Sequence, residues 1–168
     1  MDRKTLQDLQ FSRILEAAAG LTQTARGRES VLALSDLAAP VNVTTELARV
    51  DEAARLLDLP DHPSLDGAED VGPQIETAGK GGVLSAPELI AAARLLRIGH
   101  EALAAVAHWK LRAPRIAEEL QPIRDLLHVA ERLEETFDDE GRIRDDASPR
   151  LGELRAKVVY LGRRVKER

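Results

Sequence analysis

The sequence predicts an all-α protein, on the strength of two observations. Apolar residues recur at helical spacing along almost the whole chain. The 168 residues include only one Trp, one Tyr and two Phe, so the core must consist of Leu, Val, Ile and Ala, which suits closely packed helices. Cysteine is absent, which excludes a disulfide framework and a thiolate metal site. This length suits one domain, or one domain with a small appendage.

The N-terminal part of the chain is predicted to form short helices. One breaks near residues 10–12, and the next ends at Gly20. Thr22 or Thr24 can cap a further helix that runs to about Leu34, because a threonine oxygen can accept a hydrogen bond from the first helical turn.

After Pro40, Thr44 or Thr45 begins another helix. Four of its apolar residues recur at helical spacing and therefore share one face: Leu47, Val50, Ala54 and Leu57. Residues 59–73 contain three prolines and two glycines, and they are therefore the clearest predicted loop.

A short helix over residues 74–78 follows, and the glycines of residues 79–82 end it. Ser85 caps a long helix, and Glu88 completes a capping box. This helix runs to Trp109, so its ~24 residues would span roughly 36 Å. Its apolar residues at helical spacing are Leu89, Ala92, Leu96, Leu103 and Val106.

The segment Gly79-Lys80-Gly81-Gly82 has a partial likeness to a phosphate-binding loop. That motif requires a glycine five residues before its Gly-Lys pair and a Ser or Thr after the lysine. Gln74 and Gly81 occupy those two positions, and no predicted strand precedes them. A helix stop followed by a capped start explains these glycines instead.

Pro114 and Pro122 mark two more helices, and the turn at residues 138–141 follows them. Residues 142–144 are predicted to pair with residues 136–137 as a small β-hairpin. The inward residues of the two helices are predicted to be Ile116, Leu120, Ile123, Leu127, Ala130 and Leu133.

Ser148 caps the last predicted helix, with Pro149 at its first position. Six apolar residues then alternate at spacings of four and three, which is the pattern of a coiled-coil seam. They are Ala147, Leu151, Leu154, Val158, Leu161 and Val165. The seam is still in phase at the end of the sequence, which predicts that the natural helix continues.

Charge is distributed unevenly around the net value of −5. Residues 150–168 carry seven basic and two acidic side chains, whereas the other 149 residues carry 17 basic and 27 acidic ones. Four of the basic residues form a stripe beside the seam, at spacings of seven, seven and four: Arg150, Lys157, Arg164 and Arg168. They are the candidate nucleic-acid contacts, because phosphate binding requires Lys or Arg in a row. Composition favours the alternative, that they are ordinary flanking charges of a coiled coil.

No catalytic or metal site is predicted. His128 and Glu131 share a helix face, but a di-metal bundle would need Glu-x-x-His on two helices. Acidic pairs such as Glu134-Glu135 lie on adjacent helix positions that point about 100° apart, so they do not converge on one substrate. No serine is marked as an activated nucleophile.

Three segments together resemble the bacterial MutS-two family, a paralogue group of the mismatch-repair protein MutS that lacks its mismatch-reading domain. They are residues 5–34 (TLQDLQFSRILEAAAGLTQTARGRESVLAL), 80–89 (KGGVLSAPEL) and 137–155 (FDDEGRIRDDASPRLGELR). The resemblance implies a helical core domain over residues 1–146 and the truncated start of the first lever helix over residues 147–168. It implies no catalytic residue or cofactor site within these residues.

For the parent protein, the resemblance implies a cytoplasmic, ATP- and Mg-dependent homodimer that binds branched or structured DNA. A C-terminal Smr nuclease domain would cut that DNA, and the protein would suppress homologous recombination. Some members act on collided ribosomes and bind rRNA. This piece would couple the lever helices to the ATPase, and it could also dimerise by itself. No apolar run is long enough to span a membrane, and no signal peptide is visible. The alternative from another class is a stand-alone helical adaptor that recruits a protein through the seam.

Overall fold

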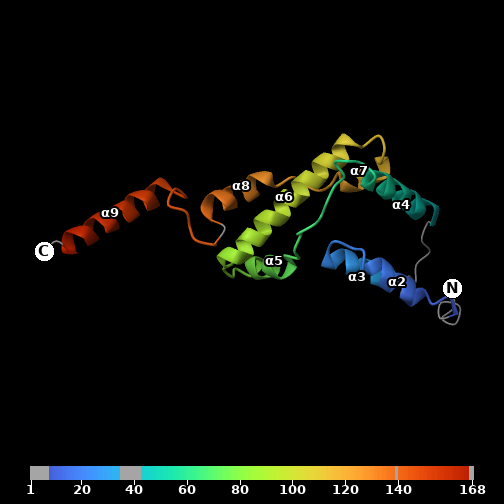
Figure 1. Ribbon diagram of the computed structural model, residues 1–168, viewed down its shortest axis with the longest axis horizontal. Coiled ribbons are helices and arrows are strands. Elements are labelled where there is room, and N and C mark those ends of the chain that lie inside the picture. The colour runs from blue at the N-terminus through green and yellow to red at the C-terminus, as the bar shows by residue number, and fades with distance from the viewer. Residues whose placement is uncertain (1–7, 35–42, 139, 167–168) are drawn as a thin grey trace. The chain divides into compact units, whose positions relative to one another are not determined.

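The computed structural model describes residues 8–34, 43–138 and 140–166. Within these ranges the chain forms eight helices and no extended strand, which confirms the all-α prediction (Figure 1). None of these helices is long and apolar enough to cross a membrane. The predicted roles of Pro40 and Arg168 fall outside the described residues. The helices are α2 (Phe11–Ala19), α3 (Ala25–Ala33), α4 (Val43–Leu57), α5 (Gly72–Gly79), α6 (Ala86–His108), α7 (Pro114–Leu120), α8 (Leu127–Thr136) and α9 (Pro149–Lys166).

Contacts divide the chain into two compact units. The first is built from the described parts of residues 1–70 and 97–125, and the second from the described parts of residues 71–96 and 126–168. A buried apolar cluster lies in the first unit and brings together residues of α4, α6 and α7 with the turns that follow α4 and α6. Its members are Leu56, Val106 and Ala113, with Leu59, Trp109, Ile116, Ala117 and Leu120 packed against them.

Local backbone conformation and side-chain hydrogen bonds set the start of each N-terminal helix. Gln10 has a φ of 51° and precedes α2, so the predicted break lies at this left-handed residue. Thr24 caps α3, because its hydroxyl oxygen accepts a hydrogen bond from the Gly27 N–H at 3.0 Å. Thr22 instead donates its hydroxyl to the Ala19 carbonyl at 2.8 Å. Of the two candidate caps, Thr24 is therefore the one that the structure uses.

The apolar face predicted on α4 does not face the core. Its large apolar residues Leu47, Val50 and Leu57 are between 59% and 64% exposed. The buried side of the helix instead contains Glu52 and Leu56, both 3% exposed. The helix turns the charged residue Glu52, rather than its longest apolar stripe, toward α7.

Glu52 is buried because it caps the start of α7. Its carboxylate accepts hydrogen bonds from the backbone N–H groups of Arg115 at 2.9 Å and Ile116 at 3.2 Å, and from Arg115 Nη1 at 2.9 Å. Pro114 has no N–H, so Glu52 satisfies the first free donors of this helix. Burial raises the pKa of Glu52, but the hydrogen bonds from Arg115 and the backbone together outweigh it and hold the pKa below its ordinary value.

The glycine segment between α5 and α6 is a helix stop and a capped start, as predicted. The Gly82 N–H donates to the Thr77 carbonyl and the Gly81 N–H to the Ala78 carbonyl, both at 2.9 Å, which is a Schellman motif. Gly81 has a φ of 81°, the left-handed conformation that favours glycine. The Ser85 N–H then donates to Glu88 Oε2 at 2.7 Å, which is the reach-back half of a capping box.

Candidate nucleic-acid interface

The small hairpin before α9 forms as predicted. Phe137 and Ile143 make an antiparallel bridge. Beside it, the Asp138 N–H donates to the Arg142 carbonyl and the Arg144 N–H to the Thr136 carbonyl, both at 2.9 Å. The described part of this turn therefore holds the chain in a fixed geometry shortly before the last helix begins.

The Asp138 carboxylate organises that turn. Its Oδ1 accepts the backbone N–H of Arg142 at 2.8 Å and that of Glu140 at 3.1 Å, and its Oδ2 accepts Arg142 Nε at 3.0 Å. The backbone hydrogen bond from Arg142 is the main cause that lowers the pKa of Asp138, with partial desolvation opposing it and the guanidinium adding to it. The turn is thus built around an ionised carboxylate.

The start of α9 is tied to the residues that follow the hairpin. Arg155 Nη1 donates to the Ile143 carbonyl at 2.9 Å and pairs with the Asp145 carboxylate. Ser148 Oγ accepts the Leu151 N–H at 3.2 Å, which confirms Ser148 as the cap of the helix. Sequence reasoning counted Arg155 only as one of the basic residues. The opposite charge of Asp145, ten residues earlier, is the signal in the sequence that could identify Asp145 as the partner of Arg155.

Three members of the predicted basic stripe lie exposed along α9. Arg150, Lys157 and Arg164 recur every seven residues, so they share one side of the helix. The Arg164 guanidinium lies 5.9 Å from the centre of the Tyr160 ring, a cation–π distance. Arg168, the fourth predicted contact, lies outside the described residues. Phosphate binding at this stripe stays a prediction.

The apolar seam of α9 is uncovered by the described residues. Leu154 and Leu161 are each 47% exposed, and Val158 and Val165 are 69% and 75% exposed. The helix itself is confirmed over Pro149–Lys166. Pairing of the seam with another helix, and hence a coiled coil, stays a prediction.

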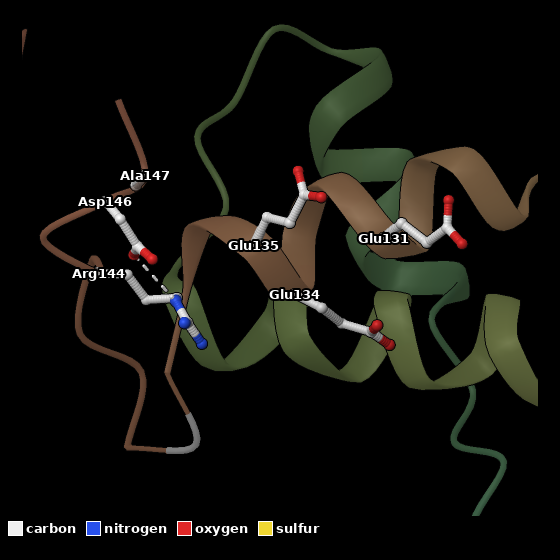
Figure 2. A pocket seen from close by; sticks show the side chains of 6 residues that line it. All are labelled: Glu131, Glu134, Glu135, Arg144, Asp146 and Ala147. Atoms are coloured by element: carbon white, nitrogen blue, oxygen red, sulfur yellow. Dashed lines mark hydrogen bonds and ion pairs between the residues drawn. The ribbon is translucent and has the colours of Figure 1, made fainter. Parts of the chain in front are cut away.

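A pocket of about 560 Å³ lies between α8 and the segment before α9 (Figure 2). Its lining is mostly acidic and consists of Glu131, Glu134, Glu135, Arg144, Asp146 and Ala147. Figure 2 shows the carboxylates of Glu134 and Glu135 pointing to different sides of the helix, while Arg144 pairs with Asp146 at 3.2 Å. Among the described residues, no group of three or more His, Cys, Asp or Glu is placed to hold a metal ion.

Comparison with known proteins identifies relatives along the whole chain, although no family model matches it. Endonuclease MutS2 of Symbiobacterium thermophilum is 32% identical over 178 residues, which cover 100% of this chain and 21% of that protein. Endonuclease MutS2 of Geobacillus kaustophilus is 31% identical over 174 residues, covering 100% of the chain and 22% of the relative. The corresponding protein of Pelotomaculum thermopropionicum is 26% identical over 167 residues, covering 99% and 21%. The chain spans about a fifth of the length of these relatives. The resemblance seen in three segments therefore extends over the full sequence, which fits a fragment of a MutS2 protein.

Proposed function

We propose that this chain is the helical core, and the start of the first lever helix, of a MutS-like nuclease. Its role is structural and allosteric. The observation that carries the proposal is the construction of α9, together with the match to endonucleases along the full sequence. The helix is fixed at its beginning by Ser148 and Arg155, whereas its seam from Leu154 onward is uncovered. Such a helix can transmit a movement from its anchored N-terminal end to a partner that packs on its exposed apolar seam.

The parent protein would supply the chemistry. By family resemblance it uses ATP and Mg²⁺, acts as a homodimer, binds branched or structured DNA and cuts it through an Smr domain. Suppression of homologous recombination, and action on collided ribosomes through rRNA, are the cellular roles that the family suggests, and the cytoplasm is the compartment. The 168 residues would couple the lever helices to the ATPase, and we assign no catalytic residue to them.

Nucleic-acid contact, if the chain itself makes it, belongs on the basic stripe of α9. Elsewhere the chain carries an excess of acidic residues, which repels phosphate. Each neutralised phosphate contributes about −0.9 to the slope of log K against log salt concentration on duplex DNA. Four contacts, from Arg150, Lys157, Arg164 and Arg168, give a slope of about −3.6, which is roughly a 150-fold loss of affinity between 50 and 200 mM salt.

The test is binding of the 168-residue chain to a four-way DNA junction across a salt series. The Lys157→Glu, Arg164→Glu double variant removes two contacts, so the slope should fall to about half of the wild-type value. A matched control is Lys110→Glu with Arg124→Glu, which makes the same charge change at two exposed residues that do not belong to α9.

Binding that is lost in the α9 variant but kept in the control would support a contact on the first lever helix. Equal losses in both variants would indicate a response to net charge and would contradict a specific stripe. Absence of binding at low salt would leave the chain as a scaffold and move nucleic-acid recognition to other parts of the parent.

The second candidate function is that of a helical adaptor, and the uncovered seam of α9 favours it. A protein partner would bury Leu154, Val158 and Leu161, which are now exposed. Apolar association depends much less on salt than phosphate binding does. Affinity for a partner that survives high salt, and is lost in Leu154→Ser, Leu161→Ser, would therefore identify the adaptor role.

A further inference from the structure

An open cavity of about 410 Å³ lies along α9 and is lined by residues that do not belong to the apolar seam. Three of them are compact and recur at spacings of four and three: Gly152, Ala156 and Val159. They share one side of the helix, because residues three and four apart are neighbours on its surface. A Cβ on Gly152 would lie 3.2 Å from the Asp145 carbonyl oxygen, so the glycine lets the segment before α9 approach closely. This cavity is called the α9 groove below.

Two arginines and one carboxylate line the α9 groove. Arg155 pairs with Asp145, and these two charges offset each other. Arg163 adds a second positive charge, four residues after Val159 on the same side of the helix. The charged groups that line the groove therefore leave an excess of positive charge, which favours an anionic ligand.

Tyr160 lies between the α9 groove and the basic stripe. Its side chain lines the groove and is 60% exposed. Lys157 precedes it by three residues and Arg164 follows it by four, so both cations are its neighbours on the helix surface. The Arg164 guanidinium lies 5.9 Å from the centre of the ring. The groove thus has an aromatic ring at one edge, and two cations of the stripe flank that ring.

An exposed aromatic ring among basic side chains is the combination that binds single-stranded nucleic acid. The cations hold the phosphates, and an unpaired base stacks on the ring. A base inside a duplex is already paired and stacked, so it must be extruded before it can reach the ring, at a cost of a few kcal/mol. The compact residues Gly152 and Ala156 leave the space beside Tyr160 open, where larger side chains would fill it.

We propose that the α9 groove binds an unpaired nucleotide of DNA, whose base stacks on Tyr160 and whose phosphates lie on Lys157, Arg163 and Arg164. This inference rests on the nucleic-acid contact proposed above and specifies the kind of DNA: a single-stranded segment, as at a flap or a fork, rather than a duplex. Phosphate contacts supply affinity that falls with salt, whereas stacking supplies affinity that does not depend on counterion release.

Fluorine NMR can test the stacking directly. The sequence contains a single tyrosine, so fluorotyrosine labels residue 160 alone in the 168-residue chain. At low salt, the fluorine resonance should shift on addition of an oligothymidylate. It should stay unchanged with an abasic strand of the same length, because the two strands share their phosphates and only the first carries bases.

Two variants of Tyr160 separate stacking from apolar packing in binding assays with a dye-labelled oligothymidylate. Tyr160→Leu keeps an apolar side chain and removes the ring, so it should weaken binding by about fivefold or more, the lower end of what one stacked base contributes. It should leave the salt slope unchanged, because it removes no charge. Tyr160→Phe keeps the ring and should bind as the wild type does. Far-UV circular dichroism checks that each variant keeps its helices.

The outcomes distinguish this proposal from the phosphate contact on which it rests. Equal, salt-dependent binding of the oligothymidylate and the abasic strand would leave the stripe as a phosphate site and overturn the stacking site. A Tyr160→Phe variant as weak as Tyr160→Leu would overturn it as well. Tighter binding of an RNA strand of matching length would assign the groove to RNA and overturn its assignment to DNA. Absence of binding to every strand at low salt would overturn both proposals.

Discussion

Replacement of Glu52 by Gln should destabilise the first unit far more than an ordinary surface substitution. The change keeps the shape of the side chain and removes its charge. The carboxylate accepts three hydrogen bonds at 2.9 to 3.2 Å, two from the start of α7 and one from the Arg115 guanidinium. The amide that replaces it has a single acceptor oxygen, so at least one of these three donors loses its partner.

The expected cost follows from these contacts. A hydrogen bond to a charged group contributes about 1.5–3 kcal/mol, and breaking a fully buried ion pair costs about 3–5 kcal/mol. The Arg115 side chain is half exposed and can be resolvated, so the lower range applies, and we expect a loss of about 2 kcal/mol. For a chain of this size, that corresponds to a decrease in Tm of roughly 4–8 °C.

Thermal and urea unfolding followed by circular dichroism at pH 7 would measure this loss. The matched control is Glu119→Gln, which removes an exposed carboxylate from the same pair of helices, 3.4 Å from Arg49. An exposed pair of this kind contributes at most about 1 kcal/mol. Equal Tm values for Glu52→Gln and Glu119→Gln would refute the assignment of Glu52 as the cap of α7.

The pH dependence gives an independent check. The pKa of Glu52 in the folded chain lies below its ordinary value of 4.5, so the folded state binds the proton more weakly than the unfolded state does. Its stabilising contribution is therefore complete above pH 4.5 and is lost as the pH falls through the folded pKa. The difference in stability between wild type and Glu52→Gln should shrink in that acid range.

Two further predictions concern the turns. Gly82→Ala should lower the stability by about 1–3 kcal/mol, because the added Cβ would lie 2.6 Å from Thr77 Cγ2 and 2.9 Å from the Thr77 carbonyl oxygen. The Cβ added by Gly79→Ala would meet nothing within 4 Å, so this substitution should raise the stability by up to about 1 kcal/mol. Tm values that change in the same direction for both variants would contradict this reasoning. Arg155→Met removes the bonds to Ile143 and Asp145, so it should increase the hydrogen exchange of the amides of residues 143–155. The exchange of the amides in α4 and α7 should stay unchanged. Unchanged exchange near Ile143 would show that Arg155 does not hold the start of α9.

The features that the sequence predicted correctly depend on residues only a few positions apart. The caps at Thr24, Ser85 and Ser148 each involve a partner three residues away. The glycine stop is closed by bonds over at most five residues, and the hairpin by pairing across one turn. Helical spacing alone placed Arg150, Lys157 and Arg164 on one side of α9, because the geometry of the helix fixes that relation.

What could not be predicted depends on distant partners. Glu52 bonds to residues 63 and 64 positions later, so no local pattern reveals why a charge is buried or which side of α4 faces inward. Helical spacing correctly identified an apolar face of α4 that contains Leu47, Val50, Ala54 and Leu57. Helical spacing could not determine whether that face packs against the rest of its own unit or stays exposed, because an apolar face has the same spacing whether it is buried or exposed.

The junction between α5 and α6 has a consequence for the order of folding. Its stop, at Thr77 to Gly82, and its start, at Ser85 and Glu88, are closed entirely by contacts within twelve residues of sequence. Local contacts require little loop-closure entropy and form fastest. This corner should consequently form early in folding, before the long-range bond of Glu52.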